Sequence, residues 1–178
     1  MSHKNINYDF ITRFLHWFMA AIIIYALIVG YALHLMIDEY PKAHYFFATL
    51  NISLSVILIP VLIIRWVWKF FRITPNPIES IPKFQHQIAE IMHEIGYFLI
   101  FFVLLSGVLM MSHSFKFFFL ISIPHLIQSI EITDFFFQIH RVSCFLLAFW
   151  VLAHVTAASH HHFFRKNSIL SRMLSQND

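Results

Sequence analysis

The sequence predicts an all-α integral membrane protein, a four-helix bundle with both termini on the cytoplasmic side. Of its 178 residues, 59% are hydrophobic and only 12% are charged, whereas a soluble domain carries about 25% charged residues. Four charge-free stretches are long enough to cross a bilayer, and short connections separate them. Lys and Arg are also shared unequally between the two sides of these stretches. These observations indicate a single transmembrane domain over residues 1–178.

The four expected spans lie between charged residues. They cover residues 14–37, 43–64, 95–115 and 142–164. At about 1.5 Å of rise per residue, each is long enough for a helix that crosses a hydrocarbon core of roughly 30 Å. Pro60 falls inside the second span, where we expect a kink. No cleavable signal peptide is evident, since the first apolar segment is too long for one.

The distribution of Lys and Arg predicts the orientation. The side with the termini and the central loop holds Lys4, Arg13, Arg65, Lys69, Arg72, Lys83, Arg165, Lys166 and Arg172. The other side holds Lys42, Lys116 and Arg141. Cytoplasmic loops are enriched in positive charge, so both termini are expected to be cytoplasmic. This asymmetry explains the net charge of +3 and gives no argument for nucleic-acid binding.

Two histidines of the last span point to a cofactor. His140 and His154 are 14 residues apart, which is almost four helical turns, so both rings face nearly the same side about 21 Å apart. This helix therefore presents one imidazole near each membrane surface. A neutral imidazole is a good ligand for haem iron, and a His on a facing helix would supply the second axial bond.

His16 is the facing residue that the sequence offers for His154. It lies in the segment RFLHW at the start of the first span, and both residues are expected near the cytoplasmic face. Two histidines at matched depth on two helices favour a bis-histidine b-type haem. Taken singly, each would be read as an interfacial or helix–helix hydrogen-bonding residue. The chain has one cysteine and no CxxCH motif, so covalent haem attachment is excluded.

Several motifs together resemble the bacterial cytochrome b561 family, in particular its small superoxide oxidase type. They are RFLHW, the segment IMHEIGYFLIFFVLLSGVLMM, and the pair His140 and His154. The resemblance covers the whole chain and implies a bacterial cytoplasmic membrane protein with two non-covalent b haems, one near each face. It assigns the inner haem iron to His16 and His154. It assigns the outer haem iron to His140 and to a histidine of the second helix.

The chain departs from this family pattern at the outer haem. The family places its second-helix histidine 14 residues before the position of Arg65, where this sequence has Asn51. Asn is not a normal iron ligand. His44 lies seven residues earlier on the same helix face, roughly 10 Å further outward. His34 and His125 are other candidate substitutes, and His140 as the only axial ligand would leave an open iron position. The sequence therefore leaves open whether the protein binds one haem or two.

Other polar residues are weaker site candidates. Arg65 and Arg141 are placed to pair with haem propionates, one near each face, although topology alone also explains Arg65. His93 is a candidate to hydrogen-bond a propionate or a quinone, or is an interfacial residue. Gly107 would let the third helix approach a porphyrin or another helix closely. The run at residues 160–162 is interpreted as interfacial, with metal binding as the alternative.

The expected function is electron transfer by a membrane haem b protein that exchanges electrons with the quinone pool. The resemblance adds a specific enzyme activity, superoxide:quinone oxidoreductase, in which superoxide donates at the outer face and ubiquinone accepts. Lys42, Lys116 and Arg141 would attract the superoxide anion. One alternative is a haem-bearing membrane anchor subunit of a dehydrogenase or hydrogenase, bound to a redox partner protein. The other is a haem-free four-helix transporter or structural protein.

Overall fold

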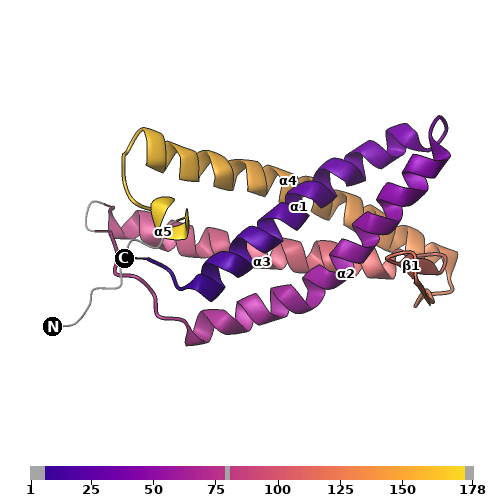
Figure 1. Ribbon diagram of the computed structural model, residues 1–178, viewed down its shortest axis with the longest axis horizontal. Helices are drawn as coiled ribbons and strands as arrows, with labels where there is room; N and C mark the ends of the chain where they lie inside the picture. The colour runs from indigo at the N-terminus through magenta and orange to yellow at the C-terminus, as the bar shows by residue number, and fades with distance from the viewer. Residues whose placement is uncertain (1–6, 79–80, 175–178) are drawn as a thin grey trace.

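The computed structural model describes residues 7–78 and 81–174, so Lys4 lies outside the described residues. Four long helices make up the fold: α1 (Phe10–Met36), α2 (Pro41–Phe71), α3 (Lys83–Leu109) and α4 (Ile130–Phe163). All four are long and apolar enough to cross a membrane. The predicted helical membrane bundle is confirmed (Figure 1). Two short strands, β1 (Phe115–Phe117) and β2 (Ile121–Ile123), and a final turn of helix, α5 (Ser171–Leu174), complete it.

Most helices extend beyond the charge-free stretches. α2 passes through Pro60 and continues past Arg65 to Phe71. Asp9 is the N-cap of α1, and its carboxylate accepts a hydrogen bond from the Thr12 N–H, as is usual at this position. α3 differs, since it ends at Leu109 although the charge-free stretch runs on to Phe115. The residues that follow form a loop and strand β1.

The helices pack as two pairs. α1 lies against α2, α3 lies against α4, and contacts between α2 and α3 join the pairs. The two pairs cross one another in Figure 1. The bundle has a terminal end, where α1 and α3 begin and α2 and α4 finish, and a hairpin end, which carries β1 and β2. α5 also lies at the terminal end (Figure 1).

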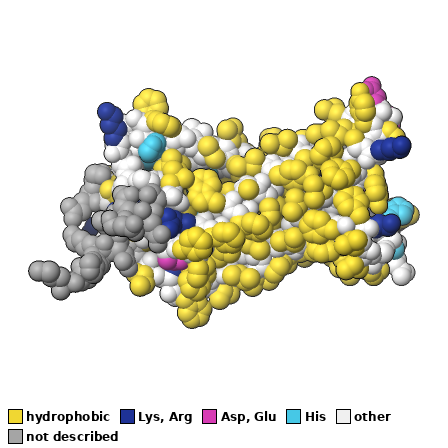
Figure 2. Space-filling view, viewed as in Figure 1, with side chains coloured by type: hydrophobic (Ala, Val, Ile, Leu, Met, Phe, Trp, Pro, Cys, Tyr) yellow, Lys and Arg dark blue, Asp and Glu magenta, His cyan; other side chains and the backbone are white. Residues whose placement is uncertain are grey.

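The core is narrow and apolar, as expected for a bundle in lipid. It is built from Met19, Ile22, Ile23, Leu58, Leu62, Leu104 and Leu147. Figure 2 shows apolar side chains covering the middle of the molecule, with Lys, Arg, Asp and Glu gathered at both ends. An exposed apolar surface of this extent is typical of contact with hydrocarbon.

The hairpin between α3 and α4 is a feature that the sequence analysis did not anticipate. β1 and β2 pair antiparallel, with Phe117 opposite Ile121. Phe118 and Phe119 in the turn have φ angles of 44° and 67°, a conformation that favours Gly or Asn. The Phe118 N–H donates a hydrogen bond of 2.8 Å to Oγ of Ser53 in α2. The turn is thereby fixed on α2.

Candidate functional site

Three histidines from three helices meet at the terminal end of the bundle. His154 of α4 lies with its ring centroid 6.3 Å from that of His16 in α1. Its centroid is also 5.8 Å from that of His93 in α3. The structure thus brings together the two residues that the sequence proposed as an axial pair, and adds His93. We call these three residues the terminal histidine cluster.

Trp150 fixes one side of this cluster. Its indole stacks on the His154 ring, with 5.0 Å between centroids and 10° between planes, and its Nε1–H donates to the carbonyl of Met92 at 2.9 Å. Gly96 of α3 lies beneath the indole, and a Cβ built there would be 2.5 Å from Trp150 Cζ2. Sequence reasoning missed this contact, although Trp150 and His154 are four residues apart and so share a helix face.

Arg65 of α2 closes the cluster on the side of His16. Its Nη2 donates to Nδ1 of His16 at 2.9 Å, and its Nε donates to the hydroxyl of Tyr97 at 3.3 Å. A guanidinium has donors only, so Nδ1 of His16 must be the acceptor in this contact. Arg65 therefore carries a positive charge into the space between α1, α2 and α3. Nearby, Lys69 of α2 forms an ion pair with Glu94 of α3.

His140 lies at the other end of α4 and is held differently. Its Nδ1 is 3.1 Å from the carbonyl oxygen of Val103 and 3.2 Å from Oγ of Ser106. Since the carbonyl can only accept, Nδ1 carries the proton and Nε2 keeps its lone pair. Nε2 is 3.4 Å from Sγ of Cys144. Gly107 of α3 lies against the His140 ring, because a Cβ built there would be 3.1 Å from His140 Cε1. The residue that comes close to α3 at Gly107 is therefore His140.

The residues considered as partners of His140 lie in different surroundings. Asn51 is half-buried in α2, and its Oδ1 is buried without a hydrogen-bond partner among the described residues. His44, one heptad before Asn51, and His125 in the last connection are half-buried, while His34 is exposed. Arg141 is exposed, with its guanidinium carbon 5.8 Å from the centroid of the Phe137 ring.

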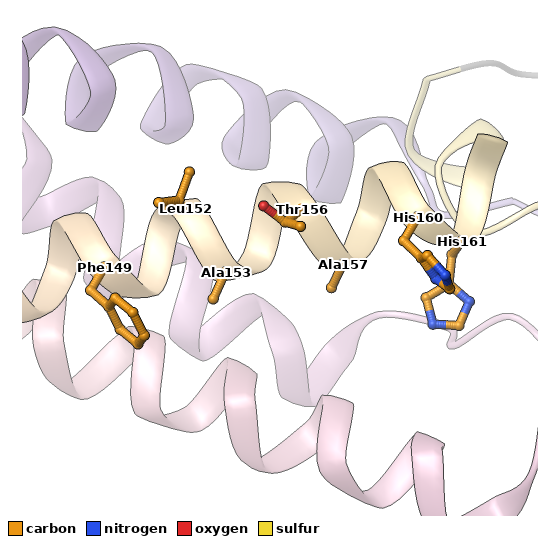
Figure 3. Close-up of a pocket in the computed structure, with 7 residues that line it drawn as sticks. All are labelled: Phe149, Leu152, Ala153, Thr156, Ala157, His160 and His161. Atoms are coloured by element: carbon orange, nitrogen blue, oxygen red, sulfur yellow. The ribbon is translucent and has the colours of Figure 1, made fainter. Parts of the chain in front are cut away.

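A groove of about 530 Å³ runs along α4 at the terminal end (Figure 3). It is lined by Phe149, Leu152, Ala153, Thr156, Ala157, His160 and His161. Nδ1 of His161 is 2.9 Å from Nδ2 of Asn167, so that amide donates to the ring. Over the described ranges, no three His, Cys, Asp or Glu side chains are arranged to hold a metal ion. The alternative of a metal site at residues 160–162 therefore gains no support.

Comparison with known families decides the class of the protein. The model of the prokaryotic cytochrome b561 family matches residues 7–176. The chain belongs to this family. A search of curated proteins found no match. As a prokaryotic cytochrome b561, the protein is a membrane haem b electron-transfer protein that crosses a bacterial membrane several times, and the haem-free transporter or structural alternative is set aside.

In the terminal histidine cluster of this cytochrome b561, the spacing of His16 and His154 matches what one iron between them would require. An imidazole nitrogen binds a metal at about 2 Å, so two rings on opposite sides of one iron have centroids roughly 6–7 Å apart. The 6.3 Å between His16 and His154 lies in that range, and the 5.8 Å between His93 and His154 is close to it. With Arg65 donating to Nδ1, the neutral His16 ring carries its proton on Nε2. Ligation through Nε2 therefore requires that this hydrogen bond be given up.

Proposed function

We propose that this protein binds haem b in the terminal histidine cluster and passes electrons between that haem and a membrane quinone, in the cytoplasmic membrane of a bacterium. The observation that supports the haem position best is the 6.3 Å separation of His16 and His154. The two residues come from α1 and α4, so the haem would bridge two helices that are not neighbours in sequence. Bound haem b supplies one-electron chemistry through its iron.

Arg65 supports the same proposal through its charge. It lies within hydrogen-bond distance of His16 and of Tyr97. A guanidinium in this place would pair with a carboxylate such as a haem propionate, because its planar donors match two oxygens at once. Losing the contact with His16 and gaining one with a propionate would leave Arg65 satisfied. The positive-inside distribution of Lys and Arg supports a cytoplasmic position for this end of the bundle.

His93 is the group that we assign to quinone exchange. It is exposed and lies 5.8 Å from His154, measured between ring centroids. A quinone carbonyl is a hydrogen-bond acceptor, and an imidazole N–H at this distance from the axial ligand would hold it close to the haem. His93 therefore contributes a donor beside the redox centre.

The experiment is a reduced-minus-oxidised spectrum of the purified protein, with haem per chain measured as the pyridine haemochrome. His16→Ala and His154→Ala should each abolish the low-spin signal of this haem. His93→Ala should keep the signal but slow re-oxidation by a ubiquinone analogue by about tenfold, the effect of losing one hydrogen bond of roughly 1.4 kcal/mol. The matched control is His160→Ala, which removes an exposed histidine of α4, the helix of His154. It should change neither the low-spin signal nor the rate of re-oxidation.

The variants identify which two histidines bind the iron. Loss of the signal in His93→Ala, with retention in His16→Ala, would make His93 and His154 the axial pair. A wild-type protein without haem would overturn the proposal altogether.

Superoxide oxidation is a second candidate activity. Lys42, Lys116 and Arg141 are exposed, and all three lie at the hairpin end, where they would attract an anion. The test is the decay rate of superoxide in the presence of oxidised protein and quinone. Replacing all three cations by Gln should slow this decay at low salt and have less effect at high salt, because salt screens exposed charges. Decay at the uncatalysed rate with wild-type protein would remove this activity.

A further inference from the structure

His140, at the hairpin end, is held differently from the histidines of the terminal histidine cluster. His140 is oriented by Val103 and Ser106 so that its Nε2 keeps a lone pair. This is the state of a metal-binding histidine, whose other nitrogen is usually held by a backbone carbonyl. In the described part of the chain, no other histidine ring lies within stacking distance of His140. The site thus offers one ligand of good geometry.

Asn51 of α2 lies at about the depth of His140 of α4. Leu58 of α2 and Leu147 of α4 are both members of the buried core. Asn51 and His140 lie one heptad nearer the hairpin end on these same helices. Seven residues are two turns, or about 10 Å of rise, so each residue keeps the face of its leucine. Asn51 and His140 each precede by 14 residues a residue that lies beside His16, namely Arg65 and His154, so both reach a similar depth. Asn51 and His140 therefore face the same layer of the bundle.

The Asn51 carboxamide is itself unusual in that layer. Its Oδ1 is buried and has no hydrogen-bond partner among the described residues. Buried acceptors in proteins are nearly always paired, so such an atom marks a place where a further donor is expected. By contrast, the Ser53 hydroxyl, two residues later in α2, donates to the carbonyl of Thr49 and accepts from the N–H of Phe118. The unpaired amide oxygen at the depth of an oriented imidazole points to a small polar molecule in this layer of the bundle.

We propose that the hairpin end binds a second haem through His140 alone, with Asn51 beside the open iron position, so that this iron takes a small exogenous ligand. The inference rests on the proposed function, because it assumes that the protein binds haem. The inference goes beyond the proposed function because it predicts one six-coordinate and one five-coordinate haem in the same chain. Oδ1 of Asn51 would accept a hydrogen bond from a water molecule at that position, and its Nδ2 would donate to a diatomic or small anion that replaces the water; the amide would not bind iron itself. The class of ligand is a diatomic or a small anion, such as carbon monoxide or cyanide.

The test is carbon monoxide binding to the dithionite-reduced full-length protein, with haem per chain measured in parallel. Wild-type protein should contain two haems and bind one carbon monoxide per chain. His140→Ala should lose one haem and all carbon monoxide binding. Asn51→His should keep two haems, lose carbon monoxide binding, and convert the high-spin signal to a low-spin one. Asn51→Leu should keep carbon monoxide binding but shift the C–O stretching frequency, because the polar neighbour is gone.

His44→Ala is the matched control on α2. It should leave carbon monoxide binding unchanged. If this variant instead creates carbon monoxide binding that wild-type protein lacks, His44 is the sixth ligand and the proposal is wrong. Two haems without carbon monoxide binding, or only one haem that depends on His16 and His154, would also overturn it. The last result would leave the proposed function standing, whereas the absence of any haem would remove both.

Discussion

The indole of Trp150 lies parallel to the imidazole of His154, with 5.0 Å between centroids and 10° between ring planes. The indole is itself held by the carbonyl of Met92 and fits against Gly96. A ring clamped in this way has one orientation, and the imidazole stacked on it has little freedom to turn. Trp150 is therefore a positioning residue for His154, because it sets the plane in which that ring would meet an iron.

Replacing Gly96 by Ala should disturb this stack. The new Cβ would lie 2.5 Å from Cζ2 of Trp150, so the indole must move, at a cost of about 1–3 kcal/mol for overpacking. We expect haem to be retained, because His154 itself is intact, but the low-spin electron paramagnetic resonance g values should shift as the imidazole plane turns. A lower thermal unfolding midpoint should accompany the shift.

Gly30→Ala is the control for this prediction. Gly30 is also within a membrane-spanning helix, α1, and a Cβ there has nothing within 4 Å. Its g values should match those of wild-type protein, and Ala should favour the helix by roughly 0.5–1 kcal/mol. Identical g values in Gly96→Ala would show that Trp150 does not orient His154.

Arg65 should raise the reduction potential of a haem held by His16. Its guanidinium lies beside the terminal histidine cluster, next to His16 and Tyr97, and a nearby positive charge favours the reduced, more negative iron. Arg65→Gln should lower the midpoint potential by roughly 50–100 mV, the shift expected for one charge about 10 Å away at an effective dielectric constant near 20. Potentiometric titration of the visible spectrum measures it.

Two variants separate charge from hydrogen bonding in this prediction. Arg65→Lys keeps the charge and should stay near the wild-type potential. Tyr97→Phe removes the hydroxyl that accepts from Arg65 and leaves every charge in place. A potential that falls as far in Tyr97→Phe as in Arg65→Gln would mean that the charge is not the cause.

Asp9, at the terminal end of the bundle, should make the stability of the protein depend on pH. Burial raises the pKa of this carboxyl, but hydrogen bonds from Thr12 and Trp68 lower it more, so its pKa lies below the usual value of 3.8. A group with a lowered folded pKa stabilises the protein above its unfolded pKa, and the contribution is lost as the pH falls through the folded pKa. Asp9→Ala should cost about 1–2 kcal/mol at neutral pH, as for other N-caps.

The measurement is thermal unfolding in detergent between pH 3 and pH 7, for wild-type protein and for Asp9→Asn and Asp9→Ala. The difference between wild-type and Asp9→Ala should be constant above about pH 5 and should shrink below about pH 4. Asp9→Asn keeps an N-cap oxygen but cannot titrate, so its stability relative to Asp9→Ala should not vary with pH. A constant difference between wild-type and Asp9→Ala down to pH 3 would contradict the assigned role.

The sequence predicted the helices well because a hydrocarbon core imposes length and apolarity on every span. It also predicted the meeting of His16 and His154, because depth along a membrane helix follows from counting residues. It did not reveal Trp150 over Gly96, or Arg65 bonded to His16. Those contacts depend on helix rotation and crossing, which side-chain packing sets and residue spacing does not.

The hairpin was missed for a related reason. Gly, Asn or Asp in the sequence normally indicates a tight turn, whereas this turn has Phe118 and Phe119 at positive φ. The partner that stabilises it, Ser53, is 65 residues away in the sequence. Local sequence signals cannot identify a turn whose stability comes from a distant helix.

Ser53→Ala should release this hairpin. Ser53 is fully buried, and its Oγ accepts the hydrogen bond of the Phe118 N–H at 2.8 Å. Without that oxygen the N–H has no partner, which should cost about 1–3 kcal/mol. Amide hydrogen exchange at Phe118 should become faster, since the turn would open locally before the bundle unfolds. Phe118→Gly should have the opposite effect on the turn, because Gly adopts a φ of 44° without strain.

The double variant Ser53→Ala with Phe118→Gly makes this prediction quantitative. If the hydrogen bond serves to hold a strained turn, Gly should recover part of the stability that Ser53→Ala loses, and the two effects should not add, because the residues are in direct contact. Ser55→Ala, a half-buried serine on the same helix, controls for loss of a hydroxyl. Unchanged exchange at Phe118 in Ser53→Ala would show that strand pairing between β1 and β2 is enough to hold the turn.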